Sequence, residues 1–295
     1  MNMLAQRFLN DWDLPKDDLS LEKTALNVEH DDFNLFSAAA SLSRVDGRSV
    51  DLHALHRGID EIAAQVSAEI TEIGSEHDGF FALQKVLFEG YGFRGDSQNY
   101  HAPENSYLED VFDRRRGIPI ALGMITCEVA RRANVSAYEI AFPGHFLVGV
   151  HQQTREGAEE LLIIDPFHGG RLRSTKDLEG QLARLARRRI PLQPEHLAPA
   201  SARVVLMRML NNLRSVYVRL QDPFRLERVL SRLLILAPGA MELNLERSRA
   251  RRLILDYEGA CADAEEVRNQ SRKGELRAAA EDLLGTLERD MRWIH

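Results

Sequence analysis

The sequence predicts an α+β fold, in which a helical N-terminal part and a small antiparallel sheet precede an all-α region. Apolar residues recur at helical spacing through most of the first 133 residues. Short runs rich in Ile, Val, Phe and Leu, bounded by Pro and Gly, follow between about 137 and 172. Helical spacing returns near residue 200. A chain of 295 residues fits two domains, which we expect at 1–195 and 200–295.

Composition excludes several classes of protein. The hydrophobic content of 44% and charged content of 28% are ordinary for a globular protein. No apolar run approaches the roughly 20 residues that span a bilayer, and the start of the chain lacks the pattern of a secretory signal. Two cysteines do not make a disulfide framework. We therefore expect a cytoplasmic protein with free buried thiols and no membrane contact.

The charge balance argues against nucleic acid as a partner. A formal net charge of −7 opposes binding to phosphates, which depends on neutralising them. The basic clusters at 114–116 and 184–191 are interpreted as helix-end or surface charge. An RNA-binding groove built from these arginines is the alternative.

Three helices are expected before the first long loop. Helical spacing of apolar residues predicts them at about 31–45, 50–70 and 78–93, and Gly90 and Gly92 break the third. The polar, turn-rich segment 94–106 follows as a loop.

A fourth helix is predicted from Ser106 to Arg116. Ser106 and Glu109 have the spacing of a capping box, and the arginines fall in the last turn, where positive charge is favoured. Gly117 is expected in the left-handed closing position. Pro119 then suits the first turn of a buried fifth helix, because proline has no amide hydrogen to leave unpaired.

Three strands are predicted at about 137–142, 145–151 and 160–165, with a loop joining the last two. His145 is expected to open the second strand after a Pro-Gly turn, and Asp165 to end the third. If these strands are antiparallel neighbours, the two residues lie side by side. A carboxylate beside an imidazole fixes its tautomer and supports its cationic form. The alternative is a purely structural pairing of a histidine with a turn aspartate.

The C-terminal region is predicted to contain a weak internal repeat. A shift of 34 residues places Asp222 on Asp256 and Leu220 on Ile254, and this period resembles tetratricopeptide repeats. A plain helical bundle remains the alternative. Because such repeats need neighbours to bury their faces, we expect packing on the first domain or on a second copy of the chain.

The segments "NSYLEDVFDRRRGIPIALGMITCEVARRANV", "FPGHFLVGV" and "LIIDPFHGGRL", followed by helical repeats, resemble the SirB-type branch of the transglutaminase-like superfamily. The resemblance covers nearly the whole chain and is clearest from Asn105 to Arg171. It implies a papain-like core in which His145 and Asp165 take the histidine and aspartate positions. The nucleophilic cysteine then belongs at the start of the buried helix, where this sequence has Ile118, Pro119 and Ile120.

No other residue replaces the missing nucleophile. Cys127 lies about eight residues further along the helix, or roughly 12 Å along its axis, beyond hydrogen-bond reach of a base. Its apolar helix face predicts a buried, unreactive thiol. A metal site at His145, Asp165 and His168 has ordinary zinc-ligand types but no supporting motif. We expect no metal and no cofactor.

These observations leave two functional hypotheses. The first is a non-catalytic binding or scaffolding protein whose helical repeats bind a protein or peptide partner, with ligand contacts from Asn105, Arg115, His145, Asp165 and His168. The second is a cysteine-independent hydrolase or amide-bond enzyme that uses His145 and Asp165 as its general base. A positioned histidine alone supplies about 10²–10⁴-fold, well below a complete triad, so the first is favoured.

Overall fold

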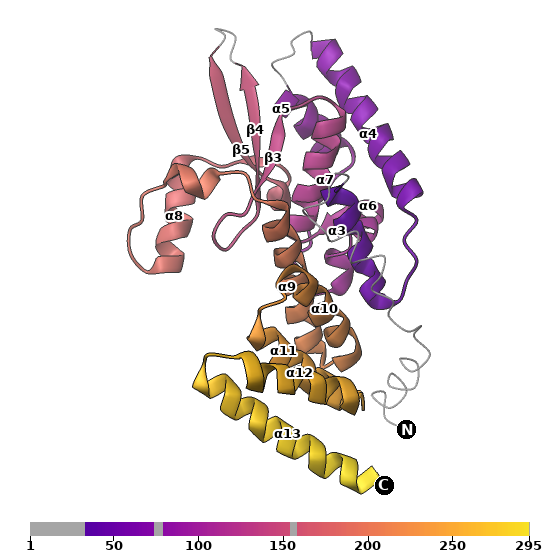
Figure 1. Cartoon of the computed structure of the whole chain (residues 1–295). Helices are drawn as coiled ribbons and strands as arrows, with labels where there is room; N and C mark the ends of the chain where they lie inside the picture. Colours follow the sequence, from indigo (N-terminus) through magenta and orange to yellow (C-terminus); the bar gives the residue numbers. More distant parts are fainter. Residues whose placement is uncertain (1–32, 74–78, 154–157, 295) are drawn as a thin grey trace. The chain divides into compact units, whose positions relative to one another are not determined.

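The computed structural model describes residues 33–73, 79–153 and 158–294, and these form two compact units (Figure 1). The first unit contains residues 34–40 and 50–209, and the second contains residue 33, residues 41–49 and residues 210–294. Along the described chain the units meet at 33–34, 40–41, 49–50 and 209–210, and the last of these points lies inside a helix. The start of the chain, where no secretory signal is predicted, lies outside the described residues.

The first unit contains the helices expected from the apolar spacing, and the α+β prediction is confirmed. The segment predicted as one helix at 78–93 is instead a short α-helix continued by one π-helical segment, η2, which ends at Gly90. The helices are α3 (Leu35–Ala40), α4 (Leu52–Ile73), α5 (Gly79–Leu83), η2 (Gln84–Gly90), α6 (Leu108–Arg114), α7 (Pro119–Arg132) and α8 (Thr175–Ala186). Short 3₁₀ turns lie at η3 (Pro103–Asn105), η4 (Pro166–His168) and η5 (Pro194–Leu197).

Helix α7 is the centre of this unit. It lies between α4 and the strands β3 (Ala137–Ile140) and β4 (Leu147–Gln153) (Figure 1). Every side chain from Pro119 to Ala130 is buried, which explains the abrupt change from the preceding arginines to an apolar run. Pro119 occupies the first turn as predicted, since its missing amide hydrogen has no intrahelical partner there.

The predicted caps of α6 are wrong. The helix begins at Leu108, after Tyr107, and Ser106 is a buried residue that does not cap it. At the other end Arg115 takes the left-handed conformation, with φ of 57°, in place of Gly117. Gly117 is needed for its size, because an added Cβ would lie 2.7 Å from Val111. Tertiary packing at this corner therefore overrides the local capping pattern.

Four antiparallel strands form the main sheet, in the order β3 (Ala137–Ile140), β4 (Leu147–Gln153), β5 (Glu159–Asp165) and β6 (Arg171–Leu172). The three longer strands confirm the prediction. The short β6 and a separate parallel pair, β1 (Arg94–Gly95) with β2 (Arg116–Gly117), were not expected.

His145 does not open a strand, contrary to the prediction. Strand β3 ends at Ile140 and β4 begins at Leu147, so His145 lies in the connection between them. A turn at Pro143 and Gly144 occupies this connection, and Gly144 has φ of +69°. The turn and its flanking residues take up 141–146, so β3 ends two residues earlier and β4 begins two residues later than predicted.

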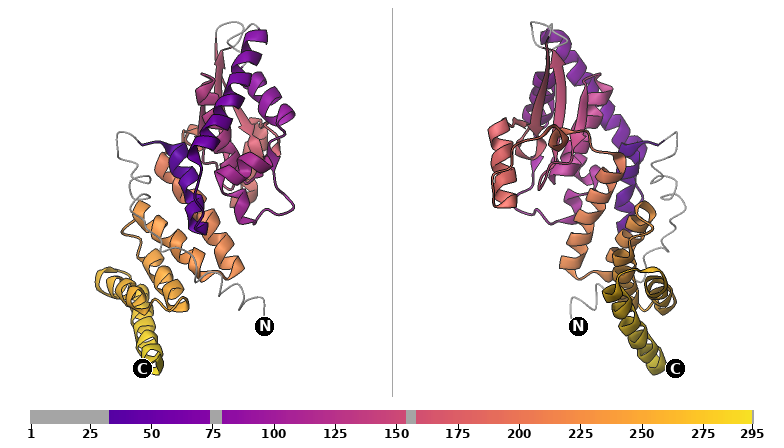
Figure 2. Two further views of the ribbon diagram at one scale, coloured as in Figure 1. Left: turned by 90° about the vertical axis from the view of Figure 1, so that its right-hand side faces the viewer. Right: turned by 60° about the vertical axis from the view of Figure 1, so that its left-hand side comes forward.

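Strand alternation assigns the two faces of the sheet. Val148 lies on the α7 side, within reach of a Cβ built on Gly123. Leu147 and Ile163 face the other way and pack in one cluster with Leu178 and Leu182 of α8. The two views in Figure 2 show the sheet and α8 from other sides. By the same alternation Asp165, two residues after Ile163, belongs to the α8 side.

The second unit is helical and shows a recurrence at 34 residues. Its elements are the end of α9 (Ala202–Leu220), α10 (Pro223–Leu236), α11 (Met241–Leu253), α12 (Tyr257–Gln270), α13 (Gly274–Ile294) and the 3₁₀ segment η1 (Ser41–Asp46). Gln221 and Leu255 both have positive φ, of 53° and 64°. Asp222 and Asp256 follow them and cap α10 and α12 with their side chains. The same turn therefore occurs twice, at the predicted interval.

Segment 41–49 joins this unit through Asp46. Its carboxylate Oδ1 accepts hydrogen bonds from the Tyr217 hydroxyl, at 2.7 Å, and from Arg225 Nε, at 2.8 Å. These contacts bridge more than 170 positions in the sequence. Among the described helices of the whole chain, none is long and apolar enough to cross a bilayer.

Candidate functional site

His145 and Asp165 lie in contact at one end of the sheet. The register that pairs Val148 with Ile164 sets Leu147 opposite Asp165, and His145 precedes that strand by two residues. The imidazole Nε2 lies 2.9 Å from the carboxylate Oδ1. The pair is at ion-pair distance, but Nε2 lacks a well-directed hydrogen bond. Nδ1 is the ring nitrogen left for a third group.

Asp165 is fully buried and has three partners. Its Oδ2 lies 2.8 Å from His168 Nδ1 and accepts a hydrogen bond from Arg173 Nη1, also at 2.8 Å. Burial favours the neutral acid, but the adjacent imidazoles of His145 and His168 outweigh it by favouring the carboxylate, and they hold the pKa of Asp165 well below its usual range. Asp165 is therefore an ionised anchor for the groups around it.

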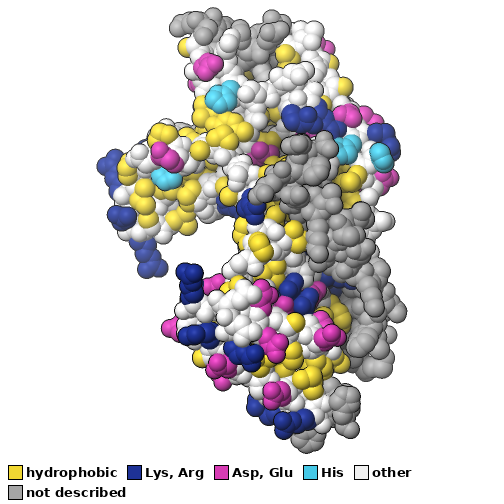
Figure 3. Space-filling view, viewed as in Figure 1, with side chains coloured by type: hydrophobic (Ala, Val, Ile, Leu, Met, Phe, Trp, Pro, Cys, Tyr) yellow, Lys and Arg dark blue, Asp and Glu magenta, His cyan; other side chains and the backbone are white. Residues whose placement is uncertain are grey.

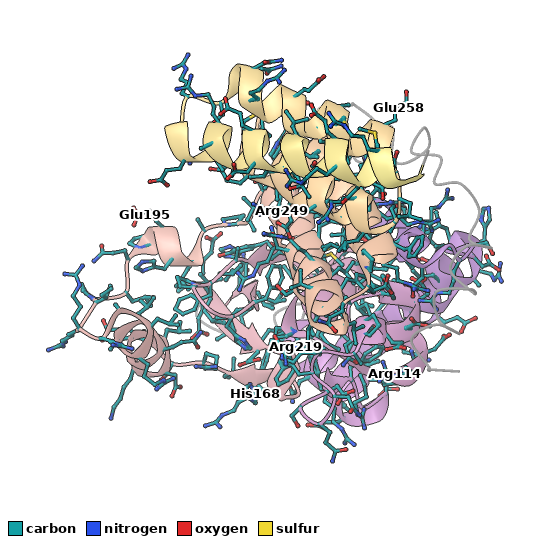
Figure 4. All side chains as sticks on the ribbon, turned by 90° about the horizontal axis from the view of Figure 1, so that it is seen from below. Arg114, His168, Glu195, Arg219, Arg249 and Glu258 are labelled. Atoms are coloured by element: carbon teal, nitrogen blue, oxygen red, sulfur yellow. The ribbon has the colours of Figure 1, made fainter. Side chains whose placement is uncertain are left out.

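A pocket of about 300 Å³ opens beside this cluster. The turn before β4, the segment after β5 and one face of α8 form its wall. Its lining residues are Gly144, His145, His168, Arg173, Gln181, Arg184 and Leu185. His168 lies at the surface, with 59% of its side chain exposed (Figure 4). The pocket is thus basic, and none of these residues carries a thiol or hydroxyl.

The expected nucleophile position is apolar. Ile118 directly precedes α7, and Pro119 and Ile120 begin it. All three are buried, with Ile118 3% and Ile120 1% exposed. They offer no group that can attack a substrate. A general base here has no side-chain nucleophile to activate at the start of α7.

Cys127 is buried within α7. Burial, and then the neighbouring carboxylate of Glu139, raise the pKa of its thiol well above the ordinary value. Thr126 is also buried, and its hydroxyl donates to the Leu122 carbonyl at 2.8 Å. Neither group is part of the pocket beside His145.

Asn105 lies outside the pocket and has structural contacts. It is fully buried, and its Nδ2 donates to the Asn99 carbonyl at 2.7 Å and to Asp96 Oδ2 at 3.3 Å. Its Oδ1 accepts from Arg114 Nη1 at 3.0 Å. These contacts tie the loop before α6 to the end of that helix.

Arg115 also lies away from the pocket, in an aromatic cage. Its guanidinium carbon is 4.3 Å from the ring centre of Phe112, 4.8 Å from that of Phe93 and 5.3 Å from that of Tyr91. Burial lowers the pKa of Arg115. The cage gives this arginine cation–π contacts within the fold.

The ligand atoms of His145, Asp165 and His168 lie within 4.8 Å of one another, a spacing that a metal ion can bridge. Arg173 shares Oδ2 of Asp165 with His168. A divalent cation at this oxygen would meet the guanidinium charge directly. The donor types fit a metal, but the fixed positive charge opposes it.

The sequence interpretation missed helix α8, which supplies three lining residues. Its signal was present, because Ser174 and Asp177 have the spacing of a capping box and form both of its hydrogen bonds. Leu178 and Leu182 supply the apolar face. No local sequence pattern marks Arg173, because its role depends on a contact with Asp165. The pairing of β5 with β6 brings these two residues together.

Comparisons with known proteins agree with this architecture. Residues 53–211 match the family described as the transglutaminase-like superfamily. A UPF0162 protein of Xylella fastidiosa is 31% identical over 235 residues, covering 79% of this chain and 82% of that protein. Another, from Pseudomonas aeruginosa, is 31% identical over 186 residues, covering 63% and 65%.

A further relative is larger. F-box only protein 21 of Mus musculus is 30% identical over 159 residues, which are 51% of this chain and 23% of that protein. No solved structure matches the chain.

Proposed function

The chain belongs to the transglutaminase-like superfamily, and from this and the site geometry we propose that it is a non-catalytic binding or scaffolding protein of the cytoplasm. In this proposal it is a SirB-type member, the pocket beside His145 and Asp165 holds a ligand, and tetratricopeptide-like C-terminal helices hold a protein or peptide partner.

The observation that carries the proposal is the missing nucleophile. The pocket holds an ionised Asp165 against His145, yet its lining residues have no thiol or hydroxyl. At the start of α7, where the superfamily resemblance calls for a cysteine, the chain buries Ile118, Pro119 and Ile120. A pocket that orients polar groups without a nucleophile suits recognition better than covalent catalysis.

Two further observations support binding. In F-box only protein 21 the matching segment is a minor part of a longer protein, so a similar domain occurs there joined to other segments. In this chain the last residue of α11, Leu253, and Leu255 in the turn after it are 61% and 54% exposed. Apolar side chains exposed in this way are available for contact with another protein.

The proposal is tested by capture of a partner on the purified full chain from an extract of its own cells. A partner retained by wild type should be lost with His145→Ala and retained with His151→Ala, a control at an exposed histidine of β4 outside the pocket. Retention by all three proteins would contradict a role for the pocket in binding.

The second candidate function is a hydrolase in which His145 acts as general base on water. The observation that favours it is the Asp165 carboxylate on Nε2, which leaves Nδ1 to take a proton. A p-nitrophenyl ester panel separates the two functions. We expect wild type to release p-nitrophenol no faster than His145→Ala, and faster release that needs His145 would favour the hydrolase.

A further inference from the structure

We propose that the pocket beside His145 binds one carboxylate group, presented by the C-terminus or an acidic side chain of a peptide segment. This inference rests on the proposed function, because it names the ligand class of the same site. Three observations support the inference: the charge of the surrounding segment, the charges inside the pocket and the apolar side chain at its rim.

Segment 171–189 is strongly basic although the chain as a whole is acidic. It contains seven arginines or lysines and two acidic residues, a net charge of +5, whereas the whole chain carries −7. Helix α8 lies in this segment, and Figure 3 shows Lys and Arg side chains at its exposed end. An approaching anion is attracted to this part of the surface.

Inside the pocket, one guanidinium charge remains after pairing. Arg173 is neutralised by Asp165 at 2.8 Å, and its Nη2 donates to Gln181 Oε1 at 3.4 Å. Gln181 in turn donates to the Pro143 carbonyl at 3.0 Å. Arg173 and Gln181 are therefore held in place by the protein.

Arg184 is the remaining charge. It is exposed, lines the pocket and has no acidic partner among the described residues. The carboxylate of Asp165 and the guanidinium groups of Arg173 and Arg184 together sum to +1, which one carboxylate balances. A guanidinium binds a carboxylate with two parallel hydrogen bonds, which gives this anion a defined orientation.

The rim adds an apolar contact. Leu185 is 56% exposed and packs over the Pro143–Gly144 turn, since an added Cβ on Gly144 would lie 2.9 Å from its Cδ1. An aliphatic group next to the bound carboxylate can rest on Leu185. The lining includes no Phe, Tyr or Trp on which a base could stack, and about 300 Å³ suits one amino-acid side chain. A peptide is therefore favoured over a nucleic acid.

The test uses N-acetyl-leucine as the carboxylate probe and N-acetyl-leucinamide as its neutral match. Both are titrated into the full chain labelled with ¹⁵N-histidine, and the side-chain resonances of His145 and His168 report binding. Arg184→Ala removes the proposed contact. Arg188→Ala removes an equal charge four residues away, at an exposed position outside the pocket lining.

N-acetyl-leucine should shift both histidine signals saturably, and the amide should not. The Kd should rise about tenfold in Arg184→Ala, because a charge-assisted hydrogen bond is lost, and less than twofold in Arg188→Ala. Equal weakening in the two variants, or equal binding of the amide, would overturn the inference. A uridine oligonucleotide that binds more tightly and depends equally on both arginines would assign the surface to nucleic acid instead.

Failure of the inference and failure of the proposed function give different results. Binding of the carboxylate together with ester release that needs His145 would refute only the non-catalytic function. A captured partner that needs His145, without carboxylate binding, would refute only the inference.

Discussion

Gly123 of α7 touches the ring of Phe146, the residue after His145. A Cβ built on Gly123 would lie 2.7 Å from Cδ1 of that ring. Arg208 holds the same segment through hydrogen bonds from Nη1 to the Phe142 carbonyl, at 3.1 Å, and from Nη2 to the His145 carbonyl. Its guanidinium carbon lies 5.7 Å from the ring centre of Phe146. The backbone of His145 is thus positioned by α7 and by Arg208.

Gly123→Ala should destabilise the protein by about 1–3 kcal/mol, because the methyl group would push Phe146 and overpack the core. The intrinsic helix preference of alanine, worth about 1 kcal/mol, acts in the opposite direction. Urea unfolding followed by circular dichroism measures the difference. Gly285→Ala in α13 is the matched control, since its nearest atom is Arg289 Nη1 at 3.8 Å. Loss of stability in both variants would contradict the packing argument.

His145→Ala should cost about 1–2 kcal/mol of unfolding free energy. Asp165 keeps two partners, His168 and Arg173, so its charge stays compensated. A loss beyond about 3 kcal/mol would assign His145 a structural role. Chemical denaturation at pH 7 decides between these outcomes.

Asp165 should make stability depend on acid pH. Its pKa in the folded protein is lowered, so its contribution is present above the unfolded value, about 3.9, and is lost as the pH falls through the folded value. Asp165→Asn should cost about 3 kcal/mol at neutral pH, because Arg173 loses its buried counter-charge. The difference in unfolding free energy between wild type and Asp165→Asn should narrow as the pH falls from 5 to 2. If urea titrations over this pH range gave a constant difference in unfolding free energy, the claim that Asp165 is ionised in the folded protein would be refuted.

Cys127 should react slowly with a thiol reagent while the protein is folded. Its thiol is buried and its pKa is raised by that burial, so little thiolate forms at neutral pH. Cys261→Ser leaves Cys127 as the sole thiol, and its reaction with 5,5′-dithiobis(2-nitrobenzoate) is followed with and without urea. Stoichiometric labelling within seconds in the absence of urea would make Cys127 a candidate nucleophile.

Both aspartate caps of the second unit should stabilise it. Asp222→Ala and Asp256→Ala should each cost about 1 kcal/mol, the usual value of an N-cap side chain. Asp222 should cost more, because its Oδ2 also accepts from Arg225 Nη1 at 2.7 Å. Asp282→Ala on the exposed face of α13 should change stability by less than about 0.5 kcal/mol. No effect at Asp256 would argue against two equivalent turns.

Local patterns predicted elements well and helix ends poorly. The apolar run after Pro119 gave α7, and the runs around His145 and Asp165 gave β4 and β5 to within two residues at each end. Ser106 has the residue type of a cap, yet it is buried and Leu108 begins the helix. Capping signals are short, and burial at a crowded corner outweighs the roughly 1 kcal/mol that a cap supplies.

The α+β class, the buried helix with no thiol at its start and the 34-residue interval between Asp222 and Asp256 follow from the sequence alone, because periodicity and residue type are local properties of the chain. Which side chains surround His145 was decided by the tertiary structure. Arg173, Gln181 and Arg184 reach it only because β6 and α8 fold back over the end of β5. Spatial neighbours separated by some 30–40 positions are chosen by the packing of whole elements, and no local pattern encodes that choice.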